Sequence, residues 1–207
     1  MSWLLTLIRV DVLFELACFA ISLLVSIGFI RAHLKIGSET FLLLGTGFSI
    51  MAGAMLVRSI YILAALASVR EPLRFGHMLV QLPSIETIYS VIRLTAYVLF
   101  IIAYLLPQLR RPSSFAMMLP TLTLYNPTFE LTAAVLLVYI VVMTTVNWSY
   151  TRSMGSGEIA LGFWALMISH ITTFMTIVNF VFYFIGHVTQ LIGLILIVIG
   201  TWEASRG

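Results

Sequence analysis

The sequence predicts an all-α integral membrane protein that crosses the bilayer with six transmembrane helices. Apolar residues make up 61% of the 207-residue chain and charged residues only 9%, against about 45–50% and about 25% in soluble globular domains. So few polar side chains cannot cover a water-facing surface. The apolar residues also fall into six stretches, each near the roughly 20 residues that cross ~30 Å of hydrocarbon as a helix.

The first three stretches occupy the N-terminal half of the chain. In chain order they are residues 12–30, 41–69 and 85–106. Each is followed by basic residues together with glycine or proline, which favour a turn at the membrane surface. The second stretch is longer than the bilayer requires, so it is expected to tilt or protrude.

The C-terminal half contains the other three stretches. The fourth is residues 129–148, the fifth begins near Glu158 and the sixth ends near Trp202. No residue between Ile159 and Ile185 is formally charged. The turn between the fifth and sixth spans is therefore placed within residues 179–187, where asparagine, glycine and histidine interrupt the apolar run.

All prolines are predicted to lie between the spans, because a proline inside a helix leaves a backbone carbonyl unpaired in lipid. They are Pro72, Pro83, Pro107, Pro112, Pro120 and Pro127. Four of them fall in residues 107–127, which we interpret as a Pro-rich interfacial loop within a single membrane domain, 1–207. Its apolar middle, residues 115–125, is too short to cross and is expected at the interface or against a partner.

The two halves of the chain resemble each other. DVLFEL at 11–16 is matched by NPTFEL at 126–131, and GSETFLLLGTGF at 37–48 by GSGEIALGFWAL at 155–166. This indicates repeat units 1–110 and 126–207 of three helices each. Because three is odd, the pattern predicts inverted-topology repeats.

Six spans also place both termini on one side of the membrane. Lys and Arg are nearly balanced between the two sides, so the charge rule does not choose the orientation. We expect cytoplasmic termini in the cell membrane.

Two stripes of small residues predict close helix packing. Gly45, Ser49 and Gly53 recur every four residues, and Gly186, Gly193 and Gly200 recur every seven. Small side chains let helix backbones approach closely in lipid, where no hydrophobic force drives helices together. The second and sixth spans are therefore expected to be packed more centrally than the fourth.

Three charged residues fall within the predicted hydrocarbon region, where a lone charge is costly. Glu15, Arg58 and Arg93 belong to the first half and, at about 1.5 Å rise per residue, to one leaflet. We predict that they cluster inside the bundle, either as a structural ion-pair network or as an anion or substrate site or proton-coupled gate; the arginines could instead snorkel to the interface. Two arginines facing one deep carboxylate leave positive charge unless an anion or Glu86 balances it.

The second half has no matching arginines. Glu130 mirrors Glu15 and is expected near the opposite membrane face. His170 lies near the middle of the fifth span, where it is either a hydrogen-bonded structural residue or a proton relay or quinone contact.

No cofactor is predicted. Haem between His170 and His187 is disfavoured because axial ligands need similar depth, and these two histidines are about half a bilayer apart in the predicted spans. The histidines, acids and single cysteine lack metal-site spacing. The net charge is +3 and the basic residues are scattered, which excludes a nucleic-acid footprint.

The chain contains no nucleophile elbow, phosphate-binding loop or paired catalytic carboxylates, so we do not expect an enzyme. It is predicted to be a non-catalytic accessory or anchoring subunit of a membrane complex, or a membrane sensor module. Its expected partners are the lipid bilayer and other membrane subunits or further copies of itself.

The main alternative is a small transporter with an intramembrane Glu/Arg site, and a lesser one is a quinone- or haem-linked redox subunit. A transporter needs a hydrated cavity and usually a broken helix. The absence of prolines from the predicted spans therefore favours the subunit or sensor.

Overall fold

The computed structural model describes residues 2–68, 72–109 and 128–204, and within them the chain forms six long α-helices, one short 3-10 helix and no strand. Every long helix contains a segment long and apolar enough to cross a membrane. The predicted fold class, an all-α membrane protein with six spans, is confirmed. The helices are α1 (Ser2–Ile36), α2 (Glu39–Ala67), α3 (Pro72–Leu109), α4 (Thr128–Thr151), α5 (Met154–Phe174) and α6 (Val181–Ala204), with the 3-10 helix η2 (Met175–Ile177) between the last two.

Glycine and asparagine form two of the turns. Gly37 ends α1 with a positive φ of 72°, a conformation that glycine adopts without steric cost, and its N–H donates to the His33 carbonyl at 2.7 Å. The turn after α5 lies at 178–180, where the Asn179 side chain accepts from the Val181 N–H at 2.9 Å. The turn predicted within 179–187 is thus found at the start of that range, and His187 lies inside α6.

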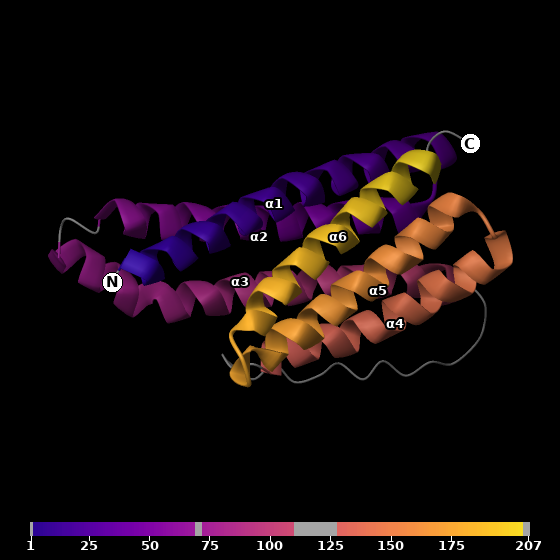
Figure 1. Cartoon of the computed structure of the whole chain (residues 1–207). Coiled ribbons are helices and arrows are strands. Elements are labelled where there is room, and N and C mark those ends of the chain that lie inside the picture. Colours follow the sequence, from indigo (N-terminus) through magenta and orange to yellow (C-terminus); the bar gives the residue numbers. More distant parts are fainter. Residues whose placement is uncertain (1, 69–71, 110–127, 205–207) are drawn as a thin grey trace.

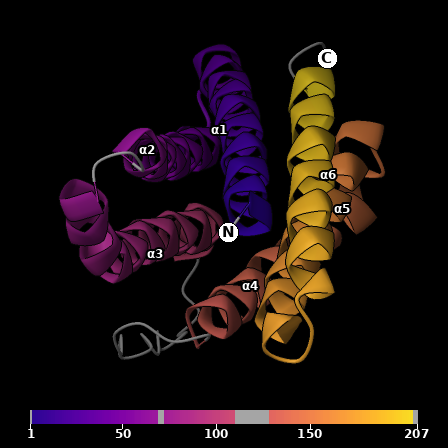
Figure 2. The ribbon, with the colours of Figure 1, turned by 60° about the vertical axis from the view of Figure 1, so that its left-hand side comes forward.

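Pro83 and Pro107 are both inside α3, and the prediction that every proline lies between spans is wrong for Pro83 but not for Pro107, which follows the spanning segment. Pro83 falls within the membrane-crossing part of this helix, Val80–Leu106. Figure 2 shows the first turns of α3 at an angle to the rest of the helix. An internal proline removes one helical hydrogen bond and produces such a bend.

Helices α1 and α6 run in the same direction. Tyr183, near the start of α6, donates a hydrogen bond to Asp11, near the start of α1. Toward the other end, a Cβ added to Gly28 of α1 would lie 2.8 Å from the Thr201 hydroxyl of α6. Six helices that alternated strictly in direction would have made this pair antiparallel.

Helices α3 and α4 are the neighbours in the chain that break the alternation. Both are antiparallel to α5, because Tyr97 and Phe100 of α3 contact His170 and Phe163 respectively, and Glu130 at the start of α4 also contacts His170. Accordingly α3 ends, and α4 begins, at opposite ends of the bundle (Figure 1). Residues 110–127, which include the predicted interfacial segment 115–125, lie outside the described residues.

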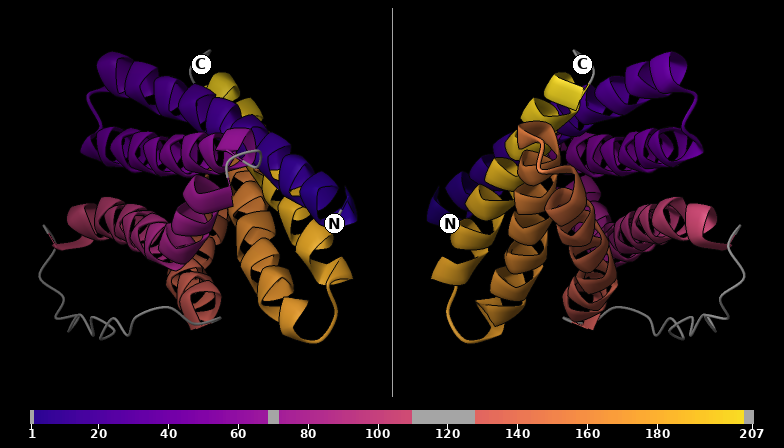
Figure 3. Two further views of the ribbon diagram at one scale, coloured as in Figure 1. Left: turned by 90° about the vertical axis from the view of Figure 1, so that its left-hand side faces the viewer. Right: turned by 90° about the vertical axis from the view of Figure 1, so that its right-hand side faces the viewer.

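The predicted inverted repeat is therefore wrong: α1–α3 and α4–α6 are parallel units. The first helix of each unit packs on the third helix of the other, α1 on α6 and α4 on α3, as the end-on views in Figure 3 also show. For the same reason, α1 begins and α6 ends at opposite ends of the bundle (Figure 1), not on one side as predicted.

The glycines of α6 form a close seam with α5. A Cβ on Gly193 would lie 2.8 Å from the Gly162 carbonyl oxygen, and a Cβ on Gly200 would lie 2.5 Å from that of Gly155. A Cβ on Gly186 would lie against the Thr173 side chain and 3.1 Å from the Ser169 carbonyl oxygen of α5. Glycines spaced by seven on both helices therefore let the two backbones touch.

The stripe on α2 is only partly a packing surface. Gly45 lies against Ile30 and Ser26 of α1, and Ser49 shares a hydrogen bond of 2.6 Å with Ser26. Gly53, however, faces outward with no atom within 4 Å of its added Cβ. The expectation that α2 and α6 are packed more centrally than α4 is wrong for both: 28% of the spanning segment is buried in α6, and 39% in α2 as in α4.

Candidate functional site

At one end of the bundle, Arg58 of α2 is surrounded by three carboxylates. Its Nε donates to Glu86 of α3 at 2.7 Å, and its Nη1 donates to Asp11 of α1 at 3.2 Å and also to Glu15. Asp11 and Glu15 are both buried. We call the end of the bundle that holds these four side chains the charged end.

Helix α6 joins this cluster through its first two turns. The Tyr183 hydroxyl donates to Asp11, and His187 Nε2 lies 3.7 Å from the same carboxylate. The His187 ring also stacks on Phe14 and meets the edge of Tyr183 at 4.4 Å between centroids. Asp11 therefore connects the two units across the contact between α1 and α6.

A second cluster connects the units across α3, α4 and α5. Arg93 Nη2 donates to Glu130, whose other oxygen lies 2.6 Å from His170 Nδ1. His170 Nε2 lies 2.5 Å from the Tyr97 hydroxyl. With Glu130 ionised, Nδ1 carries the ring proton and Nε2 accepts from Tyr97, so Tyr97, His170 and Glu130 form a continuous hydrogen-bonded chain.

Tyr89 lies between the two clusters. Its ring centroid is 5.3 Å from the Arg58 guanidinium carbon and 5.1 Å from that of Arg93, within the range of a cation–π contact. The two clusters thus form one polar network to which all six helices contribute. Its members are Asp11, Glu15, Arg58, Glu86, Tyr89, Arg93, Tyr97, Glu130, His170, Tyr183 and His187.

The predicted cluster of Glu15, Arg58 and Arg93 is divided in the structure. Glu15 and Arg58 form the expected ion pair, whereas Arg93 pairs with Glu130. Glu130 lies with Arg93 instead of near the opposite face, because α4 runs parallel to α1 and begins at the same end of the bundle. Of the two expected ways to balance the arginines, an anion or Glu86, the structure shows Glu86, which pairs with Arg58, and the network holds four carboxylates and two arginines.

The three tyrosines of the network were not anticipated from the sequence. Tyr89 and Tyr97 stand four residues before and after Arg93, a spacing that places all three on one face of a helix. That periodicity could have identified them. Nothing in the sequence marks Tyr183, because its partner Asp11 is 172 residues away.

A layer of four buried phenylalanine rings separates the polar network from the other end of the bundle. Phe48 of α2 stacks on Phe29 of α1 and contacts Phe100 of α3 and Phe163 of α5, with centroid distances of 4.6–6.2 Å. All four rings are at most 1% exposed. Phe100 follows Tyr97 by one turn of α3, so the layer lies directly beside the network.

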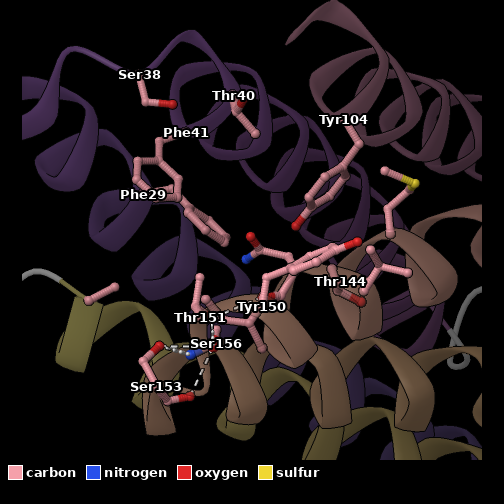
Figure 4. Close-up of a pocket in the computed structure, with 15 residues that line it drawn as sticks. Phe29, Ser38, Thr40, Phe41, Tyr104, Thr144, Tyr150, Thr151, Ser153 and Ser156 are labelled. Carbon is pink, nitrogen blue, oxygen red and sulfur yellow. Dashed lines mark hydrogen bonds between the residues drawn. The ribbon is translucent and has the colours of Figure 1, made fainter. Parts of the chain in front are cut away.

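Beyond this layer, the opposite end of the bundle contains a pocket of about 490 Å³. All six helices contribute to its wall. One lining residue from each, in order from α1 to α6, is Phe29, Thr40, Tyr104, Asn147, Ile159 and Ala204. Figure 4 shows the Phe29 and Phe41 rings on one side and the Tyr104 hydroxyl directed toward them from the other. We call this the pocket end.

Both ring nitrogens of His170 are occupied by protein partners, and His187 lies in the other cluster. Within the described ranges, no group of three or more histidine, cysteine, aspartate or glutamate side chains is arranged to hold a metal ion. The expected absence of a cofactor stays a prediction.

Comparisons with protein-family models, with curated proteins and with solved structures give no match for this chain.

Proposed function

We propose that this protein is a small-solute transporter whose two three-helix units alternately open the pocket end and the charged end. One observation carries the proposal: a pocket lined by all six helices is open at one end of the bundle, while the other end is closed by aromatic rings and ion pairs. A pocket enclosed between two structural repeats is the arrangement that such transporters use.

The parallel arrangement of the units supports this proposal. Repeats related by an axis along the membrane normal are one of the two classes on which transporters are built. Here each unit contributes its first and third helices to the contact with the other. Rocking of one unit against the other would widen the bundle at one end and narrow it at the other.

The polar network is suited to act as the gate at the charged end. Two hydrogen bonds of the network join the two three-helix units: Tyr183 donates to Asp11, and Arg93 donates to Glu130. Both can break when the units move apart and form again when they return. Ionisable residues within a membrane are costly and commonly mark transport pathways. The prediction of an intramembrane Glu/Arg site thus becomes a gate at one end of the pathway.

The sequence favoured an accessory subunit or sensor over a transporter because no span was expected to contain a proline. Pro83 lies inside a span and a pocket lies between the units, so that reason no longer applies. The subunit or sensor role, the protein partners and the membrane of residence stay predictions.

Alternating access can be tested with one thiol placed in the pocket. In a Cys18→Ser background, which removes the single native cysteine, Asn147→Cys would be treated with a membrane-impermeant maleimide from either side of sealed vesicles. The thiol is expected to react from the side of the pocket end, and weakening the gate with Tyr183→Phe should add reaction from the other side.

Gly53→Cys in the same background is the matched control. Gly53 faces outward, so a thiol there is expected to be covered by lipid and unreactive in both backgrounds. The contradicting result is reaction of Asn147→Cys from one side only in all three backgrounds: without a gate variant, with Tyr183→Phe and with Arg93→Gln. The pocket would then be a vestibule that never opens to the other side.

A further inference from the structure

None of the described residues that line the pocket carries a charged side chain. These residues are aromatic, aliphatic, hydroxyl-bearing or amide-bearing, and they come from all six helices. We propose, as an extension that rests on the proposed function, that the pocket binds a neutral solute that has several hydroxyl groups and one apolar face.

Polar groups in the wall are available to such a solute. Among the described residues, neither the Asn147 amide nor the Tyr104 hydroxyl has a protein hydrogen-bond partner, although both line the pocket. An amide offers two donors and an acceptor, and a phenol offers one of each. Together they match the mixed donor and acceptor character of a hydroxyl group.

Four of the other hydroxyls around the pocket, those of Thr144, Thr151, Ser153 and Ser156, are already engaged. Thr144 donates to backbone carbonyls of its own helix at 2.9 and 3.1 Å. At the rim, Ser156 shares hydrogen bonds with Thr151 at 2.7 Å and with Ser153 at 2.8 Å, as the dashed lines in Figure 4 indicate. From the polar groups that keep hydrogen-bonding capacity, we assign Asn147 and Tyr104 to solute recognition.

Aromatic rings supply the apolar part of the wall. Phe29 and Phe41 are stacked with 6.0 Å between their centroids, and Tyr104 and Tyr150 add two further rings. The C–H face of a ring-shaped polyol can lie against such surfaces while its hydroxyls meet the amide and phenol. The volume of about 490 Å³ falls within the roughly 300–1,000 Å³ of small-molecule sites.

The same wall disfavours an ion. A charged solute would lose hydration in the pocket and find no opposite charge among the described residues that line it, which costs far more than burying a hydrogen-bonded neutral group. The charged side chains of the polar network lie beyond the phenylalanine layer, at the other end of the bundle. Neutral solutes are therefore selected over anions and cations of the same shape.

The test uses three probes that share one carbon skeleton: D-glucose, its carboxylate D-gluconate and its amine D-glucosamine. The first readout is binding, measured as protection from maleimide of a Thr40→Cys thiol in the Cys18→Ser background, since Thr40 lines the pocket and Asn147 is kept. Glucose at saturation is expected to slow labelling by about tenfold or more, and neither charged probe should do so. The second readout is uptake into proteoliposomes, where glucose should exceed each charged probe by about tenfold.

Two variants of Asn147 sharpen the test. Asn147→Leu keeps the size and removes the hydrogen bonds, so glucose uptake is expected to fall about tenfold. Asn147→Asp adds a carboxylate, which should lower glucose uptake and raise that of glucosamine. Gly53→Leu, which changes an outward-facing position, should leave all three unchanged.

Equal uptake of gluconate or glucosamine, or unchanged glucose uptake in Asn147→Leu, would overturn the assignment of a neutral solute. A second result separates the two proposals: none of the three probes gives protection or uptake, but Asn147→Cys still reacts from both sides after Tyr183→Phe. This result would overturn the assignment of a neutral solute and leave the transport proposal standing. The same absence with reaction from one side only would overturn both.

Discussion

Arg93 is buried, with its side chain 7% exposed, and Glu130 is its acidic partner. Removing one member of a buried ion pair leaves the other charge without compensation, whereas replacing both removes the cost. Glu130 also holds His170 in position. A glutamine at 130 can still accept from His170 Nδ1, so the charge can be changed without breaking that contact.

We predict that Glu130→Gln alone lowers the free energy of unfolding by about 3–5 kcal/mol, because Arg93 is then buried without its counter-ion. Adding Arg93→Met should restore most of the loss. Thermal unfolding of the four purified proteins in detergent, analysed as a double-mutant cycle, measures this coupling. If the double variant is as unstable as Glu130→Gln, the loss does not come from leaving Arg93 without its counter-ion, and the prediction is contradicted.

Sequence patterns located most of the network's charges but not their pairing. Glu15 and Arg58 were paired correctly, since both lie at similar depth in helices joined by a short turn. Glu130 and His170 were also singled out, because polar residues inside apolar spans are conspicuous. Their contact with Arg93 depends on the direction of α4, which residue patterns in the spans do not determine.

At the scale of single helices, the α5–α6 seam depends on glycines that face each other at the same spacing. The seven-residue spacing in α6 predicted a packing face, and the matching Gly155 and Gly162 give α5 the complementary one. The four-residue stripe of α2 was less informative, because its last member, Gly53, faces away from every neighbour. Spacing predicts a face but does not say how far along a helix the contact continues.

We predict that Gly193→Ala lowers the free energy of unfolding by about 1–3 kcal/mol, because its Cβ would lie 2.8 Å from a backbone carbonyl that cannot move aside. Gly53→Ala, whose Cβ meets nothing within 4 Å, should be neutral or stabilise by up to about 1 kcal/mol through helix propensity. Thermal unfolding in detergent compares the two. Equal losses would mean that the seam tolerates a wider separation of the helices.

For the whole molecule, hydropathy gave the number of spans correctly and their direction incorrectly. Apolar length reports which segments can cross a membrane, but not from which face each one enters. The inverted arrangement assumed that the chain turns back after every span, and α3 and α4 do not obey this. The pocket between parallel units therefore could not be anticipated, since its wall brings together the ends of α1, α3, α4 and α6.

The transport proposal depends on this parallel arrangement, because it brings the pocket-lining ends of both units together. The side of the membrane on which three turns lie distinguishes parallel from inverted units. Residues in these turns are Ser38 after α1, Ser153 after α4 and Asn179 after α5. Each would be changed to cysteine in the Cys18→Ser background and labelled with an impermeant maleimide from one side of sealed, oriented vesicles. Ser38→Cys and Ser153→Cys are expected to react from the same side and Asn179→Cys from the other. Reaction of Ser38→Cys and Asn179→Cys from one side, with Ser153→Cys on the opposite side, would mean inverted units and would contradict the account.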